Sequence, residues 1–267
     1  MKRVFVSGNL GVYKAAVIVL STIVILQWAL FFIFIRPKIR DITYAPLKGK
    51  IAIVIDDWGY SLQNIQTISQ FRFRVTVSVL PNLKFSRVVA EKLHGMGHEV
   101  ILHLPMEPQE PKRLEKNTIL TSMDASMVRN ILADDLKQLR LAQGVSNHMG
   151  SRATEDMETV TALFKELKRR KLYFLDSRVS TKSVCQKVAA SQRLRFAKRD
   201  VFLDNRSDPE YILAQIEELK ERAVAFGMSI GIGHDRRNTL EVLREVIPEL
   251  EKEGFKMVVL SELVKKQ

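Results

Sequence analysis

The chain has 267 residues, 46% of them apolar, which is enough for one sizeable hydrophobic core. Its charged fraction of 27% is ordinary, so the composition excludes a collagen-like or wholly disordered protein. The formal net charge of +12 suits either attraction to an anionic lipid or polymer, or simply a basic, soluble surface. We expect no nucleic-acid partner. The single cysteine, Cys185, excludes an internal disulfide and does not define the compartment.

The first predicted element is an apolar helix over residues 15–35, preceded by a short tail, residues 1–14. The stretch carries no charged side chain, and as a helix it would be ~32 Å long, close to the ~30 Å core of a bilayer. Arg36, Pro37 and Lys38 follow it, where a cleavable signal peptide would have small residues. We therefore interpret it as an uncleaved, single-pass signal anchor. Basic residues flank both ends almost equally, and we expect the large domain on the extracytoplasmic, periplasmic side.

Residues 36–48 are polar, carry two prolines and are predicted to form a linker. From residue 49 to 267, short apolar runs alternate with longer helical patterns. Helix starts are indicated by Asp208 before Pro209 and by Asn238 as a capping residue. The predicted strands are near-continuous apolar runs over residues 50–55, 74–80, 98–104, 145–147, 172–175, 201–203, 229–232 and 256–260. This alternation predicts an α/β fold, a parallel seven- or eight-stranded (β/α) barrel that is closed or nearly closed.

Reactive side chains follow the predicted strands at their carboxyl ends. In a parallel α/β barrel these ends share one face, so we expect the side chains to meet in one cleft. Carboxylate oxygen and imidazole nitrogen together suit Zn²⁺ or a similar divalent cation. Such a cation activates water and polarises a carbonyl, while a free carboxylate and a histidine can transfer protons. The set comprises Asp56, Asp57, His103, Glu107, Asn147, His148, Asp176, Arg178, Asp204, Asn205, His234 and Asp235.

Six ordered motifs carry a family resemblance that spans about residues 50–264. They read IDDWG from Ile55, HLPME from His103, NHMGS from Asn147, FLDSR from residue 174, VFLDN from residue 201 and GIGHD from residue 231. The set resembles the divergent branch of the polysaccharide deacetylase superfamily. This resemblance implies a barrel of the glycoside hydrolase/deacetylase type, a divalent metal, and hydrolysis of an N-acyl group on a sugar.

The resemblance also implies residue roles: Asp56 as the general base, Asp57 and His103 as metal ligands, and His234 as the general acid. Glu107 stands where ordinary deacetylases have a second metal histidine, and their Arg-x-Pro-Tyr motif is absent. We expect His148 to supply the missing imidazole, with Glu107 as a fourth ligand or as a group behind the ligands. The alternative for Asp57, His103 and His148 is a hydrogen-bonded structural network without metal.

Further residues are expected to contact the substrate: Trp58, Asn147, Asp176, Arg178, Asp204 and Asn205. Trp58 would stack on a sugar ring, or else pack in the core. Arg178 would hold a sugar hydroxyl or carboxylate, or else form a structural pair with Asp176. Asp204 and Asn205 could instead cap a loop. His94 and His98 are predicted to lie on the surface, away from the cleft.

The predicted function is metal-dependent removal of an acetyl or other N-acyl group from an envelope polysaccharide or amino sugar. One alternative is a non-catalytic carbohydrate-binding or envelope-organising domain on the same fold. Another is a metal hydrolase of a different ester or glycosidic bond, since fold does not fix chemistry. The sequence names no protein partner.

Overall fold

The computed structural model describes residues 10–34 and 46–266. Residues 1–9 of the expected tail, residue 35 of the expected anchor and residues 36–45 of the expected linker lie outside the described residues. The chain forms two units, Met1–Tyr44 and Ala45–Gln267.

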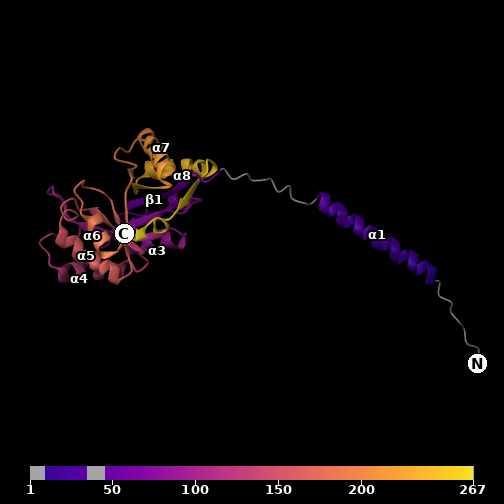
Figure 1. Cartoon of the computed structure of the whole chain (residues 1–267), viewed down its shortest axis with the longest axis horizontal. Helices are drawn as coiled ribbons and strands as arrows, with labels where there is room; N and C mark the ends of the chain where they lie inside the picture. The colour runs from indigo at the N-terminus through magenta and orange to yellow at the C-terminus, as the bar shows by residue number, and fades with distance from the viewer. Residues whose placement is uncertain (1–9, 35–45, 267) are drawn as a thin grey trace, which may run out of the picture. The chain divides into compact units, whose positions relative to one another are not determined.

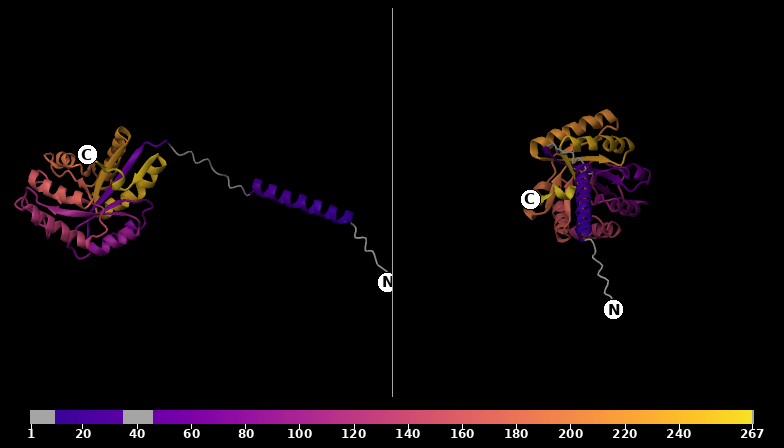
Figure 2. Two further views of the ribbon diagram at one scale, coloured as in Figure 1. Left: turned by 60° about the horizontal axis from the view of Figure 1, so that its bottom comes forward. Right: turned by 90° about the vertical axis from the view of Figure 1, so that its right-hand side faces the viewer.

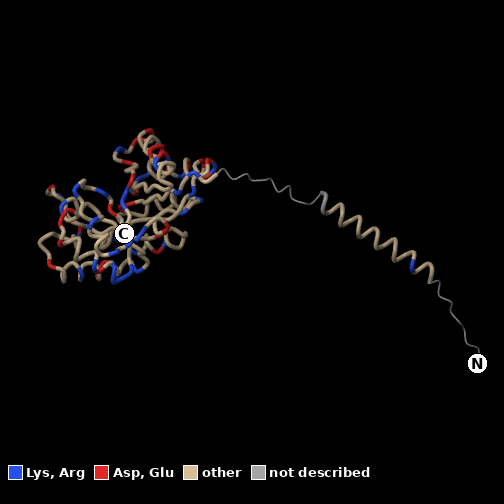
Figure 3. Tube along the Cα trace, in the orientation of Figure 1, with Lys and Arg blue, Asp and Glu red and all other residues tan. Residues whose placement is uncertain are grey.

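The first unit is the helix α1 (Leu10–Phe34), which begins five residues before the expected anchor. Its segment Gly11–Phe31 has a mean hydropathy of 2.0, and none of that segment is buried. Lys14 is its one charged residue in the described part, as Figure 3 shows. By length and composition, α1 is therefore long and apolar enough to cross a membrane.

The second unit is an α/β domain whose helices surround a curled sheet (Figures 1 and 2). The strands are β1 (Gly49–Trp58), β2 (Thr76–Val79), β3 (Glu99–Met106), β4 (Gly144–Met149), β5 (Tyr173–Asp176), β6 (Arg195–Lys198), β7 (Val201–Phe202), β8 (Met228–His234), β9 (Phe255–Val258) and β10 (Lys265–Lys266). The helices are α2 (Ile65–Ile68), α3 (Ser86–Gly95), α4 (Ala125–Gln138), α5 (Met157–Arg169), α6 (Cys185–Gln192), α7 (Pro209–Phe226) and α8 (Arg237–Lys252), with the 3-10 helix η1 (Leu260–Glu262).

Side-chain caps set the starts of three of these helices. Asp124, Asp156 and Asp208 each accept a backbone N–H from the first turn of α4, α5 and α7, respectively. The predicted start at Asp208 and Pro209 is therefore confirmed. The predicted cap at Asn238 is wrong, because α8 begins at Arg237 and the Asn238 amide instead donates to the Ser207 carbonyl.

The sheet is parallel except at one short edge strand. Its order is β10-β6-β5-β4-β3-β2-β1-β8-β7, with β9 beside β1. Only β10, which pairs with β6, is antiparallel among the described strands. Strands β6 and β10 were not predicted. The expected parallel α/β barrel is confirmed as a curled, parallel-dominated sheet.

Two residues, Arg199 and Asp200, connect the two sides of this curled sheet. The strand before them, β6, pairs with β5, and the strand after them, β7, pairs with β8. The Arg199 N–H donates to the Asp176 carbonyl (3.0 Å), and the Asp200 N–H donates to the Ile230 carbonyl (2.9 Å). One continuous backbone segment thus belongs first to one side of the sheet and then to the other.

The apolar residues of the strands alternate between two cores, as a period of two requires. Ile51, Ile53 and Ile55 belong to the larger core under the helices, whereas Ala52 and Val54 belong to a smaller core inside the sheet. The same alternation operates in the other long strands. We call the alternate positions that face the smaller core the inner series. Side chains that continue this inner series beyond its last apolar residue therefore lie at the carboxyl end of the sheet.

Candidate active site

The two aspartates after β1 reach the same cleft because the strand contains an irregularity. Asp56 continues the inner series of Ala52 and Val54, so regular alternation would turn Asp57 toward the helices. Instead, the register of β1 against β2 shifts between Ile55 and Trp58, and Asp57 adopts a φ of 67°. Both carboxylates consequently line the cleft, and Trp58 takes the outward position in the larger core.

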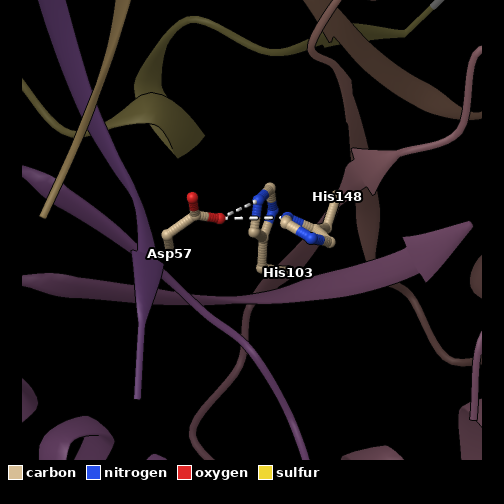
Figure 4. A group of neighbouring side chains, drawn as sticks. All are labelled: Asp57, His103 and His148. Atoms are coloured by element: carbon tan, nitrogen blue, oxygen red, sulfur yellow. Dashed lines mark hydrogen bonds and ion pairs between the residues drawn. The ribbon is translucent and has the colours of Figure 1, made fainter. Parts of the chain in front are cut away.

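Asp57, His103 and His148 converge in the cleft (Figure 4). Asp57 Oδ1 lies 3.2 Å from His103 Nε2 and 3.0 Å from His148 Nδ1. One ligand atom from each residue lies within 4.8 Å of the other two. The three side chains come from β1, β3 and β4; β3 and β4 are neighbours in the sheet, and β2 lies between β3 and β1.

Two serine hydroxyls fix the orientation of His103. Its Nδ1 lies 2.8 Å from Ser146 Oγ, which in turn lies 2.6 Å from Ser78 Oγ. Because Nδ1 is occupied by this contact, Nε2 is the nitrogen that faces Asp57. Sequence reasoning missed both serines, although Ser146 lies two residues before His148 and so shares its face of β4.

The electrostatics of the site separate the two aspartates. Burial would raise the pKa of Asp57, but hydrogen bonds and charge from His103 and His148 outweigh it and hold that pKa well below its ordinary value. At Asp56, burial dominates and raises the pKa, despite the opposing charges of His103 and His234. Asp57 is thus the permanent anion of the pair, and Asp56 is the better proton acceptor.

The donor set fits a divalent cation. Two imidazole nitrogens and one carboxylate oxygen are ligands that Zn²⁺ accepts, and three protein ligands are typical of a catalytic site. Two buried polar atoms beside the group, Asp56 Oδ1 and His148 Nε2, have no hydrogen-bond partner in the described structure. Unpaired buried polar atoms are costly in a structural network, so their presence favours a site built for a ligand.

His234 lies across the cleft and is held by Asp204. In the β1–β8 pairing, His234 is the partner of Asp56. Its Nδ1 lies 2.8 Å from Asp204 Oδ1, and its Nε2 lies 3.9 Å from Asp57 Oδ2. Burial opposes protonation, but the hydrogen bond and charge of Asp204 and the charges of Asp57 and Asp56 outweigh it and raise the pKa of His234.

The cleft has a volume of about 450 Å³, and its floor is formed by these reactive side chains. The loop after β3 contributes Pro108, Gln109, Glu110 and Lys112 to the lining. Val179 and Phe202 line the cleft too, and the Phe202 ring lies edge-on to His234 at 5.1 Å. A sugar unit with an acyl group has room in such a space.

Three expected substrate contacts are buried instead. Trp58 is fully buried and offers no surface to a sugar ring. Asp204 is fully buried too; its Oδ2 accepts from the His234 N–H and the Thr239 hydroxyl, so it positions His234. Asp176 shares the outward face of β5 with Phe174 and accepts from the Arg178 N–H and the Ser183 hydroxyl.

Asn147 and Asn205 do not present free polar groups to the cleft either. Asn147 lines it, but its Oδ1 accepts from the Ser177 N–H and its Nδ2 donates to the Met149 carbonyl. Asn205 is exposed beyond β7 and its amide lies 3.5 Å from the Tyr211 hydroxyl. Arg178 is exposed and does not itself line the cleft, although its sequence neighbours Ser177 and Val179 do.

Glu107 is not brought into the group of ligands. Its Oε2 accepts from both the N–H and the hydroxyl of Thr121, and its Oε1 lies 3.6 Å from Arg152 Nε. The carboxylate therefore holds the loop that forms one wall of the cleft. The predicted surface position is also wrong for His98, which is buried, although His94 is exposed as expected.

Comparison with known proteins places this chain in a family. Residues 53–264 match the family model described as divergent polysaccharide deacetylase. The uncharacterized protein YibQ of Escherichia coli K12 is 35% identical over 204 residues, which are 76% of this chain and 64% of that protein. The chain therefore spans less than two thirds of the length of this relative. An uncharacterized protein of Haemophilus influenzae is 32% identical over 80% of this chain and 76% of its own.

Solved structures agree in fold. The uncharacterized protein ATU2773 from Agrobacterium tumefaciens C58 superposes with a TM-score of 0.74 at 22% identity, over 81% of this chain and 89% of that one. The Bc1960 peptidoglycan N-acetylglucosamine deacetylase gives a TM-score of 0.51 at 14% identity, over 84% and 92% of the two chains. A family 4 carbohydrate esterase from Streptomyces lividans gives 0.53 at 12%, over 78% and 91%. The chain belongs to the divergent polysaccharide deacetylase family.

Proposed function

We propose that the domain removes an acetyl or other N-acyl group from an amino sugar of an envelope polysaccharide. The observation that carries this proposal is the convergence of Asp57, His103 and His148 on one point, with ligand atoms within 4.8 Å of one another. Asp56 and His234 flank that point from paired strands. A cation site between a proton acceptor and a proton donor is the arrangement that amide hydrolysis needs.

Asp57, His103 and His148 would hold the divalent cation, for which Zn²⁺ is the best fit to the donor set. The bound cation supplies polarisation of the acyl carbonyl and activation of water. Asp56 accepts the proton of the water whose oxygen bonds to the acyl carbon. His234, protonated and held through Nδ1 by Asp204, donates a proton from Nε2 to the nitrogen as the carbon–nitrogen bond breaks. The products are a carboxylic acid and a free amine.

The relatives support the substrate class. One structure of the same fold is described as a peptidoglycan N-acetylglucosamine deacetylase, and another as a carbohydrate esterase in complex with acetate. Both chemistries detach an acyl group from a carbohydrate. We extend that class to this chain on the strength of its own cleft, whose five reactive side chains have defined positions.

The helix α1 supports an envelope location. A predominantly apolar span of 21 residues would hold the chain in a membrane as a single-pass anchor. With the domain on the extracytoplasmic side, the cleft would face the compartment that holds envelope polymers. Cysteine labelling tests this orientation: a cysteine placed at exposed Lys182 of intact cells should react with a membrane-impermeant maleimide, and one placed at Lys2 should not.

The decisive experiment uses the full chain in detergent micelles. We expect about one equivalent of divalent metal per chain, and acetate release from N-acetylglucosamine oligomers that a chelator abolishes. The His103→Ala variant should lose both metal and activity, whereas the exposed His94→Ala variant keeps both. If the protein holds no stoichiometric metal and His103→Ala changes nothing, the enzyme proposal fails and a non-catalytic carbohydrate-binding domain takes its place. Ester and glycoside substrates run in parallel distinguish a hydrolase of another bond.

A further inference from the structure

The two ends of the sheet differ in charge. The carboxyl end carries the aspartates of the cleft, whereas lysines and arginines gather at the amino end, where the parallel strands begin. Strand β10 runs antiparallel to β6, so its last residue, Lys266, pairs with Arg195, the first residue of β6. Three neighbouring strands, β5, β6 and β10, have six cations at or just before this end, which we call the basic end: Arg170, Lys171, Arg193, Arg195, Lys265 and Lys266.

Few carboxylates neutralise the basic end. Arg170 Nε lies 2.6 Å from the buried Glu166 carboxylate, and the Arg195 guanidinium donates to the Ser261 carbonyl (3.2 Å). Glu262, which follows Ser261 in η1, is an exposed acid in this region. The remaining four cations of the basic end are exposed and form no ion pair with a carboxylate of residues 46–266: Lys171, Arg193, Lys265 and Lys266.

Two of these four cations stand where the backbone favours glycine. Lys171 follows α5 with a φ of 62°, and Arg193 follows α6 with a φ of 53°, both in the left-handed region. After α3, α7 and α8, the left-handed positions are occupied by Gly97, Gly227 and Gly254. Glycine adopts this region without a steric cost, and it is the usual residue at the end of a helix. The side chains of Lys171 and Arg193 are therefore not needed to end their helices, and their charges are available for another role.

The connection to α1 joins the domain at this same end of the sheet. Strand β1 begins at Gly49 and runs parallel to its neighbours, so the residues before it lie at the amino end. Residues 35–48, fourteen in number, link α1 to β1, and they span at most about 50 Å when fully extended. Helix α1 is long and apolar enough to cross a membrane. A bilayer that holds α1 is therefore within reach of the basic end.

We propose that the basic end binds the anionic phospholipid headgroups of the bilayer surface, so that the cleft, at the opposite end of the sheet, faces away from the membrane. Each Lys or Arg close to an anionic bilayer strengthens attachment roughly 5-fold, and clusters of about four to eight such residues beside a membrane helix bind anionic lipids. Phosphate groups accept strong hydrogen bonds from both ammonium and guanidinium groups. The inference goes beyond the proposed function: it needs the membrane location proposed for α1, but it needs no catalysis.

The test uses the full chain in nanodiscs of neutral phosphatidylcholine, alone or mixed with anionic phosphatidylglycerol. A donor dye on Gln143→Cys, just before β4, reports the amino end, and in a second preparation a dye on Lys182→Cys, after β5, reports the carboxyl end. The native Cys185 is buried and stays unlabelled. Energy transfer to an acceptor on the lipid headgroups should be more efficient from Gln143 than from Lys182 in anionic discs. The difference should fall in neutral discs and at ~1 M salt, where charges are screened beyond ~3 Å.

A variant of the basic end removes its four exposed, unpaired cations: Lys171→Gly, Arg193→Gly, Lys265→Gln and Lys266→Gln. The ratio of attached to detached domain in anionic discs should fall at least roughly 100-fold, which brings energy transfer to its value in neutral discs. Because glycine fits the left-handed backbone at two of the positions, the midpoint of urea unfolding should stay the same or rise. A matched control variant removes four exposed cations outside the basic end and should keep the efficient transfer: Lys84→Gln, Arg87→Gln, Lys116→Gln and Arg206→Gln.

Several outcomes overturn the inference. Energy transfer that is equal in neutral and anionic discs shows that the headgroups are not bound, and a higher efficiency from Lys182 than from Gln143 shows that the other end faces the bilayer. Equal losses in the two variants show an effect of general charge. A chain that does not enter the discs removes the membrane location itself. If anionic lipid has no effect but soluble alginate changes the fluorescence at Gln143, the basic end binds an acidic polymer instead. Acetate release is not measured, so failure of the deacetylase proposal leaves this test intact.

Discussion

His234 Nδ1 and Asp204 Oδ1 lie 2.8 Å apart, and the Asp204 side chain has no exposed surface. The carboxylate therefore fixes which imidazole nitrogen faces the cleft and stabilises the charged ring. It does so from outside the cleft, since Asp204 does not line it.

We expect Asp204→Asn to lower kcat for deacetylation about 100-fold, with a smaller effect on KM, because a misoriented neutral imidazole is a poor acid. Removing the carboxylate also lowers the pKa of His234, so activity that needs the protonated ring should be lost at a lower pH than in the wild type. The measurement is kcat against pH for both proteins. Asn205→Ala, an exposed neighbour, is the control. An unchanged profile in Asp204→Asn would remove His234 from the acid role.

Ser146 should influence cation affinity without being a ligand. Its hydroxyl contacts His103 Nδ1 at 2.8 Å, and loss of a group that orients a metal-bound histidine typically weakens metal binding 10- to 100-fold. We expect Ser146→Ala to raise the Kd for Zn²⁺ by roughly that factor in a competition titration with a chelating dye. Ser69→Ala, on the exposed surface after α2, should leave Kd unchanged. Equal affinities in the two variants would contradict the orienting role.

The burial of His98 predicts that the free energy of unfolding depends on pH. Burial lowers its pKa to about 4, and its Nδ1 accepts the Val75 N–H (3.3 Å). In the unfolded chain the ring titrates near pH 6.5, so the unfolded state binds the proton first as the pH falls. The contribution of the buried, neutral His98 to the free energy of unfolding is complete above pH ~6.5 and declines as the pH falls to ~4. It amounts to about 3 kcal/mol.

His98→Asn keeps an acceptor near the position of Nδ1 but cannot be protonated. In urea unfolding of the full chain, the free energy of the variant should fall less than that of the wild type between pH 6.5 and 4. His94→Asn, at the exposed end of α3, should follow the wild type. Parallel curves for His98→Asn and the wild type would show that His98 is protonated in the folded protein.

Trp58 should matter to stability and not to sugar recognition. Its ring is fully buried in the larger core, so Trp58→Ala should cost about 3–5 kcal/mol of unfolding free energy. Tyr60→Ala removes a ring that is 51% exposed and should cost far less. Urea unfolding of both variants measures the difference. A raised KM with unchanged stability in Trp58→Ala would restore the sugar-stacking interpretation.

Much of the fold follows from local sequence. The long strands β1, β3 and β8 are apolar on both faces, as strands between two cores must be, and the predicted runs coincide with them apart from their ends. Strand β6 was not predicted because its four residues, Arg195–Lys198, begin and end with basic side chains and show no apolar run. Strand β10 consists of two exposed lysines and follows only from its tertiary pairing with β6.

The alternation of side chains between the two faces of each strand accounts for much of the candidate site. His103, His148 and His234 all continue inner positions, and sequence motifs were sufficient to select them. Asp176 and Asn147 also follow strands, but the alternation turns them away from the inner series. The irregularity at Asp57 has no local sequence signal, because its left-handed backbone forms only within the assembled sheet. It was therefore not predictable that Asp57 faces the cleft and that Trp58 faces the larger core.

The connection through Arg199 and Asp200 limits how the cleft can change its width. Three backbone steps separate Lys198 from Val201, so these two α-carbons can lie at most about 11 Å apart. Strands β5 and β8 therefore cannot peel apart on this side unless β6 or β7 first detaches. A ligand that widens the cleft is then accommodated by other parts of its lining, and the loop that contributes Pro108, Gln109 and Lys112 is one of them.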